Sequence, residues 1–303
     1  MKEIAIKLPG EFYFTRDILP VALKRVHGNA LSHPHNYTGI PHWHDFFELV
    51  IITAGSGMQN IDGKSRPVSA GDVFVIAGKT THYFESFDDL EITNIMFSEH
   101  IFRDLGNYLN RIPGYHLIFR IEPELQARRG FHNTLRLSSQ KLSYVSRLCD
   151  RIQSEQDLHQ PGYEAAIISE LLELTIFLSR SADEEEGAPQ TSIRLAGLFS
   201  ILEEKFQEDW PLKRMAAYAG MSLSTLLRTF QAVVRKSPQE YLSDLRLNTA
   251  SHLLVKTDRP ISEIAFDCGF HDSNYFTKRF QKYYKMSPRT FRIREQRKSN
   301  VGN

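Results

Sequence analysis

The sequence predicts two domains of different class: an all-β jelly-roll barrel with appended helices, followed by an all-α domain built from two similar helical units. Three observations predict this division. Short apolar runs separated by turn residues fill residues 21 to about 98, helical periodicity replaces them from about Leu137, and the last third repeats at a spacing of 50 residues. With 303 residues, the chain is long enough to build two separate cores.

The composition indicates a globular, water-soluble protein. Hydrophobic residues make up 41% of the chain and charged residues 24%. No apolar run reaches the ~18 residues of a membrane span, and the N-terminus MKEIAIKLPGEFYF lacks the apolar stretch of a signal peptide. Cys149 and Cys268 are far apart and belong to no CxxC motif, which favours buried free thiols over disulfides or a zinc finger. We therefore expect a cytoplasmic protein with no membrane contact.

The small net charge of +1 conceals two halves of opposite sign. From Ser192 onward there are 19 Lys and Arg against 11 Asp and Glu, a net of +8, and the preceding residues carry 18 against 25, a net of −7. This asymmetry favours a polyanion-binding C-terminal domain, although a merely solvated basic surface has the same composition.

The barrel is predicted from evenly spaced strands and turn signals. The run FELVIITA is followed by Gly55-Ser56-Gly57, which we take as a turn, and MQNI is followed by the hairpin signal Asp62-Gly63. Gly71-Asp72 precedes a further apolar run, and a last strand, LEITNIMF, precedes the helical region. We assign residues 1–136 to this barrel.

Two amphipathic helices are predicted within residues 137–180. The first places an apolar stripe on one face, made of Leu142, Val145, Leu148 and Ile152. The pair either covers the barrel or dimerises the chain, and we expect a homodimer. The acidic stretch SADEEEGAPQ has little to bury, so residues 181–191 are predicted to form a linker before a domain at 192–303.

The C-terminal domain repeats a helix-turn-helix pattern. Phe230 matches Phe280 at a spacing of 50, whereas Gly220 and Gly269 are 49 apart because the turn has gained one residue. Each glycine fits the sharp turn between helices. The second helix of each unit is predicted to be capped by Ser222 or Ser224, and by Asp272 or Ser273.

The second helix of each unit has an apolar face and a polar face. The expected apolar residues are Leu223, Leu226, Leu227 and Phe230 in one unit, and Tyr275, Phe276, Phe280 and Tyr283 in the other. The polar faces are Ser224, Thr225, Arg228 and Gln231, and Ser273, Asn274, Thr277 and Lys278. Such side chains read base edges, and two readers joined by a rigid helix fit successive major grooves about 34 Å apart. A helical repeat with merely solvated polar faces is the alternative.

Residues 193–297 closely resemble the DNA-binding domain of the AraC/XylS transcription regulators. The second unit carries the family's signature at Ile264-Ala265, Gly269-Phe270, Tyr275-Phe276 and Pro288, and the first unit is looser. The resemblance implies base-reading side chains at Ser224, Leu227 and Arg228, and at Ser273, Asn274, Thr277 and Lys278. Leu227 either contacts a thymine methyl group or belongs to the core. Arg279 and Lys282 are expected to contact phosphates.

The segment HWHDFFEL places His42, His44 and Glu48 on one face of a strand, and His82 follows in a later strand. These four residues resemble the metal set of cupins, which suits Zn, Fe or Mn. The sensor domains of AraC-type regulators are similarly cupin-like and often keep such histidines without a metal. The four residues are therefore interpreted as pocket-lining groups, with a structural cluster and a metal site as alternatives. We expect no cofactor.

The resemblance also extends to sugar-responsive regulators, including the rhamnose type, so a monosaccharide is the expected effector. Imidazoles, a carboxylate and an aromatic ring hold sugars by hydrogen bonds and ring-face packing. Trp43 and Phe84 are candidate aromatic contacts. Arg25, on an early strand, is a further candidate, with a solvated surface arginine as the alternative.

The complete prediction is a two-domain transcription regulator, more an activator than a repressor, with a cupin-like jelly-roll barrel and two helix-turn-helix motifs. Its expected partners are double-stranded DNA, a small-molecule effector, RNA polymerase and a second copy of the chain. We do not expect an enzyme. The rival hypotheses are a cupin metalloenzyme tethered to DNA and a dimeric DNA-binding protein that responds to no ligand.

Overall fold

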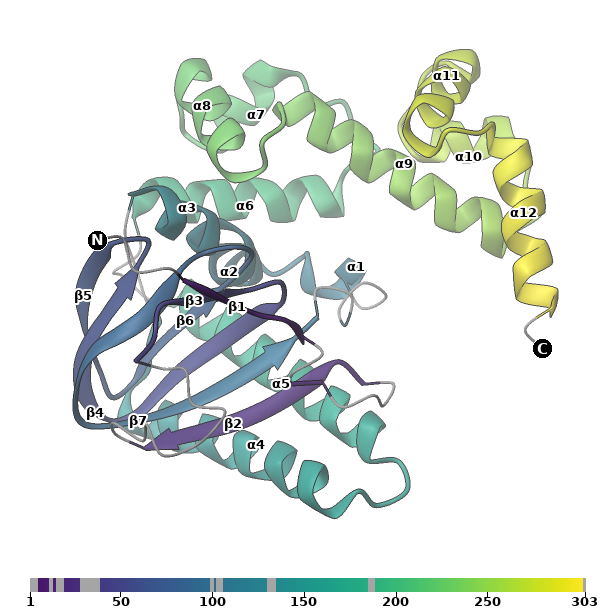
Figure 1. Cartoon of the computed structure of the whole chain (residues 1–303). Helices are drawn as coiled ribbons and strands as arrows, with labels where there is room; N and C mark the ends of the chain where they lie inside the picture. The colour runs from purple at the N-terminus through teal and green to yellow at the C-terminus, as the bar shows by residue number, and fades with distance from the viewer. Residues whose placement is uncertain are drawn as a thin grey trace. The chain divides into compact units, whose positions relative to one another are not determined.

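The computed structural model describes residues 5–10, 13–14, 19–27, 39–98, 101, 106–129, 135–184 and 189–301. The chain divides into two compact units, residues 1–196 and 197–303 (Figure 1). Within the described ranges, no helix has the length and apolar character needed to cross a bilayer.

In its described residues, the first unit contains one mixed sheet of eight strands (Figure 1). Its strands are β1 (Ile6–Leu8), β2 (Val21–His27), β3 (His42–His44), β4 (Phe47–Ile61), β5 (Lys64–Ser69), β6 (Asp72–Ile76), β7 (His82–Phe97) and β8 (Leu135–Arg136). The order is β1-β3-β7-β4-β6-β8, with β2 also paired to β7 and β5 to β4. The long antiparallel pair β4–β7 runs from Phe47 opposite Phe97 to Ile61 opposite His82. The predicted sheet-rich N-terminal domain is thus confirmed.

The predicted turn at Gly55-Ser56-Gly57 is wrong, because β4 continues through it. The ladder with β7 shifts register around Ala54 and again after Met58, so the strand bends instead of ending. Gly55 has φ of +68°, and a Cβ there would lie 2.0 Å from the carbonyl oxygen of Asp89. The glycine therefore permits the close approach of β7. The hairpin at Asp62-Gly63 forms as predicted, with both residues at positive φ.

The barrel interior is an apolar cluster with side chains from four strands. Its buried members are Val50, Ile52, Ile61, Val68, Phe74, Ile76, Phe84, Leu90 and Ile92. Their alternation along the strands identifies the inward face of the sheet.

The first unit also contains α1 (Gly106–Leu109), α2 (Pro113–His116), the π-helix η3 (Leu117–Ile121), α3 (Glu122–Arg129), α4 (Ser139–Leu158) and α5 (Tyr163–Asp183). Of these, η3, α3, α4 and α5 contact strands of the sheet. The predicted stripe of α4 is buried within the single chain at Val145, Leu148 and Ile152. The Gln156 side chain of α4 accepts a hydrogen bond from the Leu23 backbone N–H of β2 at 2.7 Å. The helix pair thus covers part of the barrel.

The start of the predicted linker is wrong, because α5 extends through Asp183 and buries Ser181 and Ala182. Small side chains fit a packed helix face as readily as a linker. Residues 185–188 of the predicted linker lie outside the described residues. The boundary between the two units also falls after Ala196, inside α6, and not at residue 191.

The second unit is entirely helical in its described part. It comprises α6 (Gln190–Glu204, whose first turns belong to the first unit), α7 (Leu212–Tyr218), α8 (Leu223–Val233), α9 (Pro238–Lys256), α10 (Ile261–Asp267), α11 (Ser273–Tyr284) and α12 (Pro288–Val301). The pairs α7–α8 and α10–α11 are the two predicted helix-turn-helix units, and α9 connects them (Figure 1). Gly220 and Gly269 occupy the turns with φ of +57° and +79°.

Candidate nucleic-acid interface and barrel interior

Helix α8 begins at a serine cap and exposes four side chains on its first two turns. The Ser222 hydroxyl accepts from the Thr225 backbone N–H at 3.2 Å and contacts the Thr225 hydroxyl at 2.9 Å, so Thr225 belongs to the cap. The exposed residues are Leu223, Ser224, Leu227 and Arg228. The predicted apolar face is too wide, because Leu223 is 42% exposed whereas Leu226 and Phe230 are fully buried. Leu227, for which a base contact and a core position were the two alternatives, is 38% exposed.

Helix α11 has the same design with a different cap. The Asp272 carboxylate accepts the backbone N–H groups of Asn274 and Tyr275 at 2.6 and 2.9 Å. Asn274 and Lys278 are exposed, and Ser273 and Thr277 are half-buried, the Thr277 hydroxyl donating to the Ser273 carbonyl at 2.8 Å.

The apolar face of α11 is narrower than predicted. Phe276 and Phe280 are fully buried against α9, but Tyr275 and Tyr283 are 56% and 40% exposed and lie outside the core. The hydroxyl of a tyrosine can remain in contact with water. The spacing of aromatic residues along α11 therefore predicted a wider buried face than the helix has.

The two predicted phosphate contacts differ in their surroundings. Lys282 is exposed near the end of α11. Arg279 is half-buried, and its guanidinium donates to the Ser243 hydroxyl of α9 at 2.9 Å. The structure thus gives Arg279 a role in joining α11 to α9, which the sequence pattern did not indicate.

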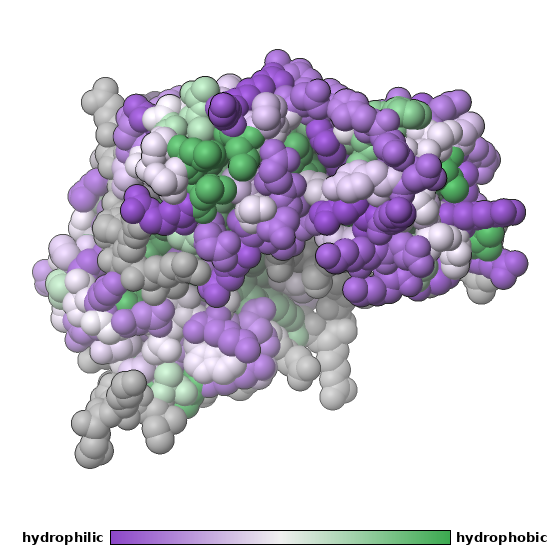
Figure 2. Space-filling model, turned by 90° about the horizontal axis from the view of Figure 1, so that it is seen from above, coloured by the Kyte–Doolittle hydropathy of each residue, from purple (hydrophilic) through white to green (hydrophobic). Residues whose placement is uncertain are grey.

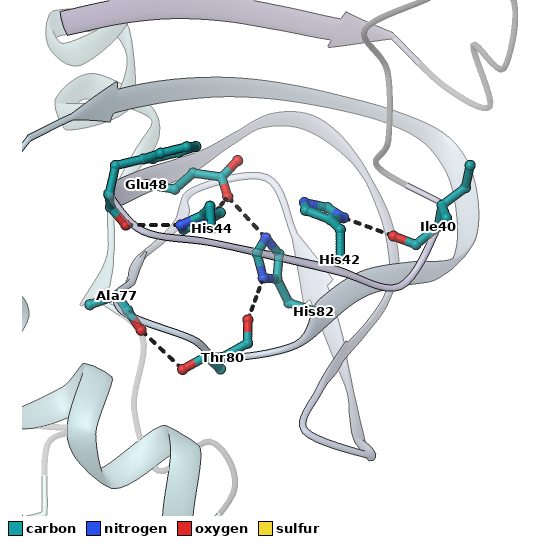
Figure 3. A network of polar contacts seen from close by, with 8 residues as sticks. Ile40, His42, His44, Glu48, Ala77, Thr80 and His82 are labelled. Carbon is teal, nitrogen blue, oxygen red and sulfur yellow. Dashed lines mark hydrogen bonds and ion pairs between the residues drawn. The ribbon is translucent and has the colours of Figure 1, made fainter. Parts of the chain in front are cut away.

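In the barrel, His44 and His82 converge on one carboxylate oxygen (Figure 3). The Nε2 atoms of both rings lie 3.0 Å from Oε2 of Glu48. His42 lies beside them, with its ring centroid 4.2 Å from that of His82. All four side chains are buried. Strands β3, β4 and β7 therefore bring together the four residues that the sequence pattern grouped.

Each imidazole also faces a backbone carbonyl through Nδ1: His42 faces Ile40 at 2.7 Å, His44 faces Phe46 at 2.8 Å and His82 faces Thr80 at 3.0 Å (Figure 3). A carbonyl accepts only, so each Nδ1 carries the hydrogen. A neutral imidazole then presents a bare Nε2, and two of these face Glu48. The cluster therefore requires one more positive charge, either a proton or a metal ion.

Burial sets the protonation of this cluster. It lowers the pKa of His42 to about 3, with His82 adding to the effect, and it also lowers the pKa of His44. Burial alone raises the pKa of Glu48, but its hydrogen bonds with His44 and His82 outweigh burial and hold that pKa below its usual value. Burial thus favours the neutral form of His42 and His44, whereas the hydrogen bonds to Glu48 favour its ionised form.

This donor set fits a divalent metal ion. Ligand atoms of His42, Glu48 and His82 lie within 4.8 Å of one another, and the Nδ1–carbonyl bonds are the outer contacts that orient metal-binding histidines. Two ligands ~2.1 Å from one ion are at most ~4.2 Å apart, so ligand atoms up to 4.8 Å apart would have to move inward to hold one ion.

Two of the other predicted effector contacts do not reach this cluster. Arg25 points away from the barrel interior and pairs with Asp150 of α4. Trp43 occupies the opposite face of β3 from His42 and His44, half-exposed, with Lys7 and Lys79 nitrogens 5.5 and 5.9 Å from its ring centroid. Strand alternation directs both side chains outward, so the structure places neither beside the histidine cluster and favours the surface alternative for Arg25.

Phe84 does point inward, two residues beyond His82 on β7, and it is buried in the apolar cluster. Opposite it on β4 lies Gln59, a residue that the sequence pattern missed. Gln59 is fully buried, and neither polar atom of its side chain has a hydrogen-bond partner among the described residues. An unpaired buried amide costs about 1–3 kcal/mol, which makes Gln59 a candidate ligand contact.

Comparison with known proteins assigns the two units. The AraC-like ligand binding domain family matches residues 30–175, and the Helix-turn-helix domain family matches residues 215–294. The HTH-type transcriptional activator RhaS of Enterobacter sp. is 30% identical over 253 residues, which cover 83% of this chain and 86% of that protein. The chain belongs to the AraC family of transcription regulators. The RhaS protein of Escherichia fergusonii is similar at 31% identity over 255 residues, with the same coverage of both chains.

Among solved structures, the DNA-binding domain of AdpA in complex with a target DNA is 27% identical. The match covers 35% of this chain and 95% of that one, with a TM-score of 0.34. As an AraC family member, the chain is a ligand-controlled, DNA-binding transcriptional activator.

Proposed function

We propose that the effector of this regulator is a small polar molecule, a monosaccharide, held inside the barrel between the histidine cluster and Gln59. The observation that carries the proposal is the buried, unpaired amide of Gln59, which lies opposite Phe84 of the apolar cluster. Gln59 faces Phe84, the inward position next to His82, so the amide and the imidazoles line one continuous stretch of the β4–β7 ladder. Sugar hydroxyls donate and accept, as both groups require.

The proposal includes the partners expected of an activator. Ser224, Arg228, Ser273, Asn274, Thr277 and Lys278 read bases, Lys282 contacts phosphate, and the DNA-bound protein contacts RNA polymerase in the cytoplasm. A homodimer is part of the proposal, as is the absence of catalysis by the barrel. This assignment is supported by the two similar proteins whose names describe them as transcriptional activators.

Thermal melts of the full chain against a panel of monosaccharides and sugar acids test the effector class. A ligand at about 100 times its Kd adds ~2.7 kcal/mol of stability, which raises the midpoint of a domain this size by several degrees. Gln59→Met retains the shape but removes the unpaired amide, so the unliganded variant should be at least as stable as the wild type. It should nevertheless lose most of the sugar-induced shift.

Gln156→Met is the matched control. Its amide oxygen is occupied by the Leu23 N–H, so this variant should lose stability but keep the sugar-induced shift. If Gln59→Met responds to the sugar like the wild type, Gln59 is not a ligand contact.

A metal site at His42, Glu48 and His82 is the second candidate, favoured by the two histidine Nδ1 atoms that donate to backbone carbonyls. The same melts with and without chelator distinguish the two. A sugar-induced shift that chelator leaves unchanged supports the polar-ligand proposal. A large chelator-induced fall in the midpoint, with no response to any sugar, supports the metal site and reopens the enzyme hypothesis.

A further inference from the structure

Helix α8 carries an apolar pair on the face that should meet DNA. Leu223 and Leu227 are one helical turn apart and are 42% and 38% exposed. Figure 2 shows apolar side chains gathered at the surface over α7 and α8. The pair is not needed for the core, because Leu226 and Phe230 are fully buried and Phe230 packs against Phe199.

The second helix-turn-helix, α10–α11, shows which residues occupy the equivalent positions when the exposed face of the helix is polar. The caps Ser222 and Asp272 are 50 residues apart, as are the buried Phe230 and Phe280. The same offset places Leu223 and Leu227 at the positions of Ser273 and Thr277 in α11. The two recognition helices thus differ in chemistry at two equivalent positions.

We propose that α8 recognises thymine methyl groups through Leu223 and Leu227, whereas α11 recognises its half-site through hydrogen bonds. This inference rests on the proposed function, in which both helices read bases. Thymine is the one base that presents a methyl group in the major groove, and apolar side chains contact it there. The two leucines are ~6 Å apart along the helix, which spans about two base-pair steps.

The neighbouring residues favour DNA over a protein as the occupant of this surface. Ser224 and Arg228 follow the two leucines directly and are exposed, so polar and cationic groups interleave with the apolar pair. The residues from Ser192 onward carry a net charge of +8. Arg228 next to Leu227 suits a guanine beside a thymine, as arginine pairs with the guanine edge.

Deoxyuridine substitution tests the proposal, because deoxyuridine pairs like thymidine but lacks the methyl group. Binding sites are first selected from a randomised duplex pool with the full chain, with and without any monosaccharide that shifts the melt. Each thymine is then replaced in turn, and duplex affinity is measured by fluorescence anisotropy. Losing one buried methyl contact should weaken binding about fourfold. We expect this loss at one or two neighbouring positions, all within one half-site.

Leu223→Ser with Leu227→Thr gives α8 the residues of α11 and should abolish the deoxyuridine effect at those positions. Ile293→Thr, which alters an exposed apolar side chain of α12 in the same domain, should leave the effect intact. The double variant keeps the buried Leu226 and Phe230, so it should fold, and circular dichroism checks this.

The outcomes separate the inference from the proposed function. If no thymine position responds in the wild type while Arg228→Ala still weakens the selected site, the leucine proposal fails and base reading by α8 stands. If the double variant binds every duplex like the wild type but fails to activate transcription, the leucines contact a protein and the proposal fails. If no duplex sequence is enriched at all, the base-reading assignment itself fails.

Discussion

Replacing Glu122 by glutamine should stabilise the sensor unit at neutral and alkaline pH. Glu122 begins α3 and is buried. Burial raises the pKa of its carboxyl to about 7, and the nearby Ser192 hydroxyl and Arg66 guanidinium lower that pKa only in part. Above pH 7 the folded protein therefore holds a poorly solvated charge, whereas the unfolded chain exposes the carboxylate to water.

The sign and size of the effect follow from these values. Between pH 4.5 and about 7 the folded state binds more protons at Glu122 than the unfolded state does, so stability falls as pH rises through this window. The difference between the ordinary value of 4.5 and about 7 corresponds to ~3 kcal/mol. Glu122→Gln removes this loss. The variant should match the wild type near pH 4 and exceed it at pH 8 by up to ~3 kcal/mol, or about 6–12 °C in Tm.

Differential scanning calorimetry of the full chain at several pH values measures this. A duplex that the protein binds shifts the transition of the DNA-binding unit alone and so identifies the sensor transition. Asp157→Asn, at an exposed carboxyl of α4, is the control and should leave the pH profile unchanged. A variant whose sensor transition shows the wild-type pH slope, or a lower Tm at pH 8, refutes the reasoning.

Two further predictions concern the DNA-binding unit. Asn274→Ala should cost ~1–3 kcal/mol on a selected duplex and spare non-specific binding, whereas Lys282→Ala should weaken all duplexes alike and reduce the salt slope by about 1; anisotropy titrations at several salt concentrations separate the two, and equal behaviour refutes the base-reading assignment. Gly269→Ala should destabilise this unit by at least ~2 kcal/mol in urea, because φ is +79° and the new Cβ would lie 2.7 Å from the Gln207 carbonyl oxygen. Gly197→Ala meets open space on α6 and should be neutral or stabilising by up to ~1 kcal/mol, so similar losses in both variants would contradict the strain argument.

The helix-turn-helix units could be predicted almost completely, because the two copies of the internal repeat can be compared with each other. Every feature that recurs at a spacing of about 50 residues, such as Phe230 with Phe280, is constrained twice. The predictions that failed concern apolar and aromatic residues that lie on the surface. Leu223 and Tyr275 continue an apolar period yet are exposed, since periodicity reports the type of side chain and not its burial.

The barrel was predictable in class but not in detail. Strand alternation correctly grouped His42 with His44 on one face of β3. The same alternation places Trp43 on the opposite face, although its aromatic ring had suggested an effector contact. Gln59 was missed because Gly55 was taken to end its strand, so the inward face could not be followed past that point. Counting back from the Asp62-Gly63 hairpin places Ile61 and Gln59 on one face, and this signal would have found it.

The residues proposed to give this regulator its specificity depart from the rule that apolar side chains are buried and polar side chains are exposed. Gln59 is polar where its strand faces an apolar interior, and Leu223 and Leu227 are apolar where their helix faces solvent. Each departure costs free energy in the isolated chain, since an unpaired amide is buried and hydrocarbon is exposed. Each cost is recovered only when a partner of matching chemistry arrives: hydroxyl groups for the amide, and methyl groups for the leucines.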